Sequence, residues 1–187
     1  MTGPFGAVDP AEPDAVQGLR WPAGFSPECS DVWARSGLVI KAPPVVVFSR
    51  LVTAGCWERD FSGVRNVRIL AGGCEDLAGR REDLPGRCGD LAEDTAFEFE
   101  MDGVRLSAQV TGFAAGRRLA WSGQGIDIST YHAWVISGHA SASHALAGFA
   151  ARGAAAIALR ETNPGAAQRA LDRWAADLKA AAEGARS

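Results

Sequence analysis

The sequence predicts an α+β protein in which a curved antiparallel sheet of about six to seven strands packs on a long C-terminal helix. Two observations carry this prediction. Apolar and polar residues alternate with period two from about residue 94 to residue 149, whereas the last part of the chain places apolar residues at helical spacing. The chain has 187 residues, of which 47% are hydrophobic and 22% charged, and this composition is typical of one globular domain.

The first part of the chain predicts a strand, two short helices and a second strand. Residues 31–43 contain a late apolar run that stops at a proline, which is typical of a strand. The prolines at 43 and 44 then suit the start of a helix, and a second short helix or turn follows at residues 55–63. In residues 64–73, Val64, Asn66 and Arg68 alternate with Arg65, Val67 and Ile69, which makes this segment a plausible next strand.

A β-hairpin is the clearest local pattern in the sequence. Its first strand places Phe97, Phe99 and Met101 on one face and glutamates on the other. Its second strand alternates in the same way, and the intervening Asp102-Gly103 is typical of a tight hairpin turn. Short turns separate three more predicted strands, which complete an antiparallel meander at residues 116–125, 129–137 and 141–149.

The C-terminal region predicts one long helix, kinked at Asn163-Pro164. Beyond the kink, Leu171, Trp174 and Leu178 recur at helical spacing, and a proline lies near the first turn. An apolar stripe of this kind needs a sheet against which to be buried.

We expect a single domain over residues 29–184, preceded by a flexible lead-in over residues 1–28. The lead-in is rich in proline, glycine and small residues, although its Trp21 and Phe25 are candidates to pack onto the domain. Residues 74–90 are charged and glycine-rich without periodicity, which indicates an inserted surface loop that is either functional or disordered.

The charge pattern argues against several classes of partner. The net charge is −3 and no run of Lys or Arg forms a stripe, so we expect neither nucleic acid nor an anionic membrane as partner. No segment reaches the ~20 apolar residues of a membrane helix, and the N-terminus lacks the features of a signal peptide. The four cysteines are widely spaced without a CxxC pair, which predicts reduced thiols in a cytoplasmic protein rather than a zinc site.

Residues 130–144 hold the only tyrosine and all three histidines of the chain, namely Tyr131, His132, His139 and His144. Strands rise ~3.3 Å per residue, so His139 at a turn lies on the order of 20 Å from His132. Zinc ligands bind at ~2 Å, and three histidines at these positions therefore cannot share one metal ion. Neither a GxSxG nucleophile elbow nor a glycine-rich phosphate loop is present, so we also expect no nucleotide or other cofactor.

Four stretches carry a family resemblance in their order along residues 32–183: IKAPPVVVFSRLVTAGCW, LAEDTAFEFEMDGVRLSAQVTGFAAGRRLAWSGQ, YHAWVIS and RALDRWAADLKAAAE. Together they resemble the START/birch-pollen-allergen superfamily, particularly its bacterial polyketide cyclase/dehydrase-like members of antibiotic biosynthesis and the related activators of heat-shock chaperones. The resemblance implies a helix-grip fold that binds a hydrophobic or aromatic small molecule between sheet and helix. The sequence departs from the family at Ala147, Gly148 and Phe149, where many relatives carry a glutamate, so no role of that carboxylate is carried over.

Candidate ligand-binding residues follow from this resemblance. In cyclase relatives the strand with Ser107 and Gln109 presents polar groups inward, whereas strand alternation alone favours Leu106 and its apolar neighbours as the inner face. Arg65 is a further candidate donor. The aromatic candidates for the cavity wall, each of which has core packing as the alternative role, are Trp57, Phe61, Phe97, Phe99, Trp121 and Trp134.

Tyr131 and His132 are the candidate catalytic residues. They are adjacent on one strand and point to opposite faces, so at most one of them faces the cavity. A cofactor-free cyclisation or dehydration would need a base such as His132 and a donor to the developing oxyanion, such as Tyr131. The alternative is that His132 is an ordinary packed histidine.

Three functions remain open from the sequence. The first is a cyclase or dehydratase, the second a non-catalytic carrier or sensor of a small apolar molecule, and the third a protein-interaction domain like the chaperone activators. A homodimer is an additional expectation.

Overall fold

In the computed structural model of the chain, residues 18–71 and 90–184 are described. They form one seven-stranded sheet in which all neighbours are antiparallel, in the order β1-β7-β6-β5-β4-β3-β2. The strands are β1 (Val32–Ile40), β2 (Val64–Ala71), β3 (Ala96–Met101), β4 (Val104–Ala114), β5 (Arg118–Gly125), β6 (Ile128–His139) and β7 (Ala142–Arg152). The helices are α1 (Pro44–Val52), the 3-10 turn η1 (Ala54–Cys56), α2 (Trp57–Asp60), α3 (Ala154–Thr162) and α4 (Ala166–Gly184).

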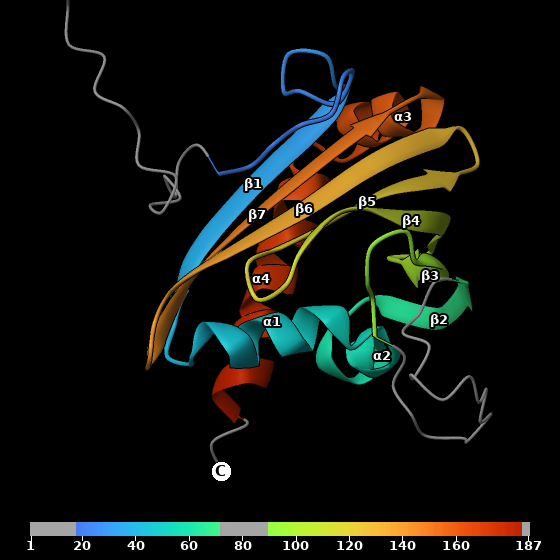
Figure 1. Cartoon of the computed structure of the whole chain (residues 1–187). Helices are drawn as coiled ribbons and strands as arrows, with labels where there is room; N and C mark the ends of the chain where they lie inside the picture. Colours follow the sequence, from blue (N-terminus) through green and yellow to red (C-terminus); the bar gives the residue numbers. More distant parts are fainter. Residues whose placement is uncertain (1–17, 72–89, 185–187) are drawn as a thin grey trace, which may run out of the picture.

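The sheet curves around α4, while α1 and α2 lie near one end of that helix and α3 near the other (Figure 1). This arrangement confirms the predicted α+β helix-grip architecture, including the two short helices after the first strand. The predicted hairpin is present as β3 and β4, with Phe99 opposite Leu106. Its turn residues Asp102 and Gly103 have φ values of 49° and 85°, which explains why Asp-Gly stands there.

The C-terminal region contains two helices rather than the single kinked helix that the spacing predicts. Helix α3 ends before Asn163, whose backbone N–H still donates to Leu159 O. Pro164 cannot supply the next helical N–H, and Gly165 takes a φ of 77°, a value that suits glycine. The chain therefore changes direction before α4 begins.

Helix α4 leans toward β1, and this determines where space is left beside it. Lys179 Nζ donates to Val39 O at 2.7 Å, and Gln168 Nε2 donates to Arg35 O at 2.8 Å. The buried Leu171 and Trp174 point into the core from the same helix. The side of α4 that faces away from β1 is consequently less tightly covered by the sheet.

The outer face of the sheet is covered in part by residues 18–28, which we call the strap. Leu19, Trp21 and Phe25 of the strap pack against a buried cluster that includes Tyr131. A side chain at Gly148 would meet Leu19 Cδ1 at 2.8 Å, so the glycine at this position leaves room for the strap. The division at residue 28 and the predicted insertion at 74–90, most of which lies outside the described residues, stay predictions.

The cysteines depart from the expectation of reduced thiols. Cys56 is disulfide-bonded, so that expectation is wrong for this residue, whereas Cys29 is an exposed free thiol. Within residues 18–71 and 90–184, no three His, Cys, Asp or Glu side chains gather as a metal ion would require. None of the helices in the described ranges is long and apolar enough to cross a membrane.

Candidate functional site

A cavity of about 380 Å³ lies between α4, the β3–β4 hairpin, the first half of β6 and the α3–α4 connection. Its walls are largely apolar, with Leu106, Ile128, Phe149, Leu159, Leu171 and Trp174 among the lining residues. Its polar lining residues are Asp102, Thr130, His132, Asn163, Arg169 and Arg173. A mostly apolar cavity of this size with a few polar groups is typical of a small-molecule site.

His132 occupies the inner face of β6 and is the candidate that the structure places at the cavity. Its side chain is only 3% exposed, and its Nε2 atom is buried without a hydrogen-bond partner among the described residues. Four aromatic rings surround the imidazole at centroid distances from 4.6 to 5.8 Å, those of Trp121, Trp134, Phe149 and Trp174. Burial among these rings lowers the pKa of His132 to about 3, so the imidazole is neutral near neutral pH.

Tyr131 lies on the opposite, outer face and does not reach the cavity. Its hydroxyl donates to Arg20 O at 3.0 Å and accepts from Arg118 Nη2 at 3.3 Å. The ring packs between Trp21 and Phe25 of the strap, with centroids 6.0 and 6.1 Å away. The prediction that at most one of these two neighbours faces the cavity is confirmed. Through its contacts with the strap, Tyr131 instead holds the end of the lead-in against the sheet.

The expected inward polar pair on β4 is not at the cavity. Ser107 and Gln109 are exposed, whereas Leu106 and Ala108 between them are buried. The expectation of inward-facing polar groups on this strand is therefore wrong, because the buried face of β3 continues onto the apolar residues of β4. Arg65 on β2 is likewise exposed and does not line the cavity.

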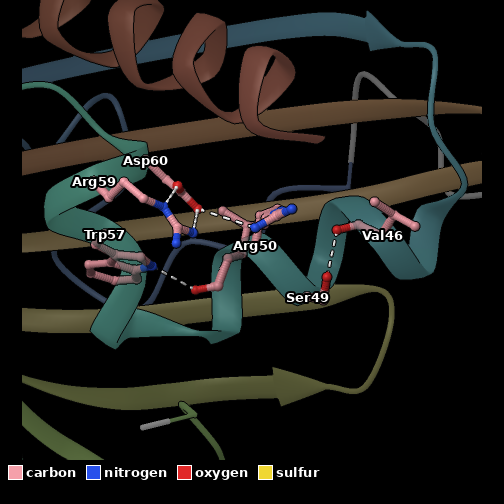
Figure 2. A network of polar contacts seen from close by, with 7 residues as sticks. Val46, Ser49, Arg50, Trp57, Arg59 and Asp60 are labelled. Atoms are coloured by element: carbon pink, nitrogen blue, oxygen red, sulfur yellow. Dashed lines mark hydrogen bonds and ion pairs between the residues drawn. The ribbon is translucent and has the colours of Figure 1, made fainter. Parts of the chain in front are cut away.

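The predicted aromatic residues mainly form the core beside the cavity. Trp57 lies within 6.1 Å, centroid to centroid, of each of its aromatic neighbours Phe61, Phe97, Phe99, Trp121 and Trp174. The indole Nε1 of Trp57 donates to Leu51 O at 3.0 Å, which ties α2 to α1 (Figure 2). Trp134 is fully buried, and none of the six predicted aromatic residues lines the cavity itself. These six aromatic residues therefore pack in the core, which was the alternative role for each of them.

Two arginines at the outer part of the cavity were missed from the sequence. Arg169 and Arg173 lie one turn apart on α4, and both line the cavity. Arg173 Nη2 donates to the carboxylate of Asp102 in the β3–β4 turn at 2.6 Å. Arg169 Nη1 donates to Pro164 O at 3.0 Å, which links it to the α3–α4 connection. Their helical spacing on the polar side of α4 was the available signal, but it is also the spacing of an ordinary solvated face.

Similar folds occur among solved structures. A hypothetical protein of Helicobacter pylori is 24% identical with a TM-score of 0.72, over 87% of this chain and 94% of its own. A START superfamily protein of Mycobacterium smegmatis is 13% identical with a TM-score of 0.54, over 82% and 95%. The allergen Ara h 8.0201 is 8% identical with a TM-score of 0.54, over 82% and 96%.

No family model and no curated protein sequence matches the chain. At these identities the structural matches establish the fold alone. The chain thus has the START/birch-pollen-allergen-like helix-grip fold that its sequence motifs resemble.

Proposed function

We propose that this protein binds a hydrophobic or aromatic small molecule in the cavity beside α4. The observation that carries the proposal is an apolar cavity of about 380 Å³ with the buried, unpartnered His132 in its wall. Buried polar atoms without partners are rare in folded proteins, because each one forfeits its hydrogen bonds to water. A bound molecule would cover the apolar walls and would bring a hydrogen-bonding partner to Nδ1, the other ring nitrogen of this imidazole.

Among the three functions left open by the sequence, this geometry favours a carrier or sensor. A general base works best when its pKa lies near the working pH, whereas burial lowers the pKa of His132 to about 3. A neutral imidazole can instead hold a ligand through a hydrogen bond.

A second candidate is a cofactor-free cyclase or dehydratase, favoured by the placement of His132 against the cavity. In this mechanism His132 would accept a proton from a substrate whose binding changes its surroundings, and Thr130 is the adjacent cavity residue with a hydroxyl. His132→Phe would then abolish turnover of a polyketide-like carbonyl substrate while leaving substrate binding measurable. Unchanged turnover would remove His132 from the reaction.

The binding proposal is tested by blocking the cavity from α4. Ala170 lines the cavity, whereas Ala176 on the same helix is exposed. Ala170→Phe should reduce binding of the uncharged probe N-phenyl-1-naphthylamine at least about tenfold, while Ala176→Phe should bind as wild type does. Equal binding by wild type and Ala170→Phe would contradict the proposal, and native mass spectrometry of the wild type would identify a co-purified ligand.

The chaperone-activator-like alternative predicts instead that binding of a protein partner is unaffected by Ala170→Phe. A cytoplasmic location, the absence of nucleic-acid partners and a homodimeric state also stay predictions.

A further inference from the structure

The polar groups of the cavity differ between its buried and outer ends. At the buried end the imidazole of His132 lies 5.2 Å, centroid to centroid, from the indole of Trp174. At the outer end lie Arg169, Arg173 and Asp102, the charged lining residues within the described ranges. A ligand that spans the cavity would therefore meet two different kinds of hydrogen-bonding group.

The buried end favours a hydrogen-bond donor on the ligand. His132 Nε2 is the ring nitrogen enclosed by protein, and the imidazole centroid is 4.6 Å from that of Trp121. Among the aromatic rings that surround this imidazole, an N–H is weakly attracted to a ring face, whereas a nitrogen lone pair is not. The proton is accordingly better placed on Nε2, and Nδ1 is then the acceptor that a neutral histidine offers to the cavity it lines.

The outer end favours an anion on the ligand. Arg173 donates to Asp102 through Nη2, and Arg169 donates to Asn163 Oδ1 at 2.5 Å through its own Nη2. Each guanidinium has five N–H donors, so these contacts leave further donors on both arginines. The two positive charges and the single negative charge also leave a formal charge of +1 at this end.

We propose that the ligand is a hydroxylated aromatic carboxylic acid, or a molecule of the same layout, with its hydroxyl toward His132 Nδ1 and its carboxylate toward Arg169 and Arg173. The inference rests on the proposed function of the cavity. The inference adds a ligand class and the orientation of the ligand in the cavity. The apolar ring system of the ligand would lie against apolar lining residues such as Phe149 and Leu171.

Four related probes separate the contributions of the ligand's hydroxyl and carboxylate to its affinity: naphthalene, 2-naphthol, 2-naphthoic acid and 6-hydroxy-2-naphthoic acid. Equilibrium dialysis should rank 6-hydroxy-2-naphthoic acid first, at least about tenfold tighter than naphthalene, because it alone has both groups. Arg169→Met should weaken only the two carboxylates, by about threefold to tenfold, and Arg169→Lys should restore part of the loss. His132→Phe should weaken only the two hydroxyl compounds.

Arg117→Met is the matched control, because Arg117 is exposed in the β4–β5 turn and does not line the cavity. It should leave all four affinities unchanged. Equal affinity of wild type for the four probes, or an equal loss for all four in Arg169→Met, would overturn the inference and leave the binding proposal standing. Absence of binding by all four probes and by N-phenyl-1-naphthylamine would contradict the proposed function itself.

Discussion

The two faces of β6 hold neighbouring residues that are buried for different reasons. On the outer face, the Tyr131 hydroxyl has both a donor and an acceptor contact and is covered by the strap. On the inner face, His132 is equally buried but its Nε2 has no partner among the described residues. The hydroxyl of Tyr131 therefore has its hydrogen bonds within the protein. The buried Nε2 of His132 has none, which lowers the stability of the fold, and its imidazole lies in the cavity wall. This difference is the reason for the proposal that His132 serves the cavity, whereas Tyr131 holds the strap.

The largest expected effect is a pH dependence of stability that comes from His132 on the inner face and not from Tyr131 on the outer face. His132 in the unfolded chain gains a proton below its ordinary pKa of 6.5, whereas the folded chain resists protonation until about pH 3. The unfolded state binds more protons in this range, so stability falls as the pH drops from 6.5 toward 3. From about pH 7.5 to about pH 5, His132 should lower the free energy of unfolding by about 2 kcal/mol.

His132→Phe should remove this contribution, so its urea unfolding should lose about 2 kcal/mol less than wild type between the two pH values. It should also be more stable than wild type at about pH 7.5, because phenylalanine leaves no unpaired nitrogen among the rings. His139→Phe makes the same change at the exposed end of β6 and should behave as wild type does. The same pH dependence in wild type and His132→Phe would contradict the assigned environment of His132.

A smaller effect is expected on the outer face at Gly148. The added methyl group of Gly148→Ala would lie 2.8 Å from both Leu19 and Trp21 and should displace the strap. We expect a loss of about 1 to 2 kcal/mol in the free energy of unfolding and faster tryptic cleavage after Arg20. Binding of N-phenyl-1-naphthylamine should not change, because the strap lies on the face away from the cavity.

Gly37→Ala on β1 is the control for this substitution, since its methyl group would meet Leu146 at an ordinary 3.6 Å. It should not change the rate of cleavage after Arg20. A Gly148→Ala protein with wild-type cleavage would show that the strap is not held at this position.

The hairpin shows why much of the fold could be predicted from the sequence. Alternation through Phe97 and Phe99 fixes which side chains are buried, and Asp102-Gly103 fixes the turn, so local patterns determine the register. The same alternation favoured an apolar inner face on β4, and the family resemblance drew Ser107 and Gln109 inward against it. The local pattern was the better guide because burying two polar side chains requires partners that this strand lacks.

The cavity was harder to predict because it depends on long-range packing. Trp174 and Leu171 belong to an apolar stripe that would look the same in a filled core. Space remains beside them because α4 leans toward β1, through contacts such as that of Lys179 with Val39, which join residues far apart in the sequence. Alternation could show that Tyr131 and His132 face opposite sides, but only the position of α4 shows which side has the cavity.

The smallest effect is expected from Tyr131→Phe, which removes one hydroxyl from the outer face. Arg20 is an exposed residue, so water can replace the hydroxyl at its O, while Arg118 loses an acceptor. We therefore expect a loss of about 0.5 to 1 kcal/mol in the free energy of unfolding by urea. Unlike the effect of His132→Phe, this loss should be the same at about pH 5 and about pH 7.5, and binding of all four naphthalene probes should be unchanged. Weaker binding of 2-naphthol by Tyr131→Phe would contradict the separation of the two faces. It would mean that the Tyr131 hydroxyl influences the cavity, although the two lie on opposite sides of the sheet.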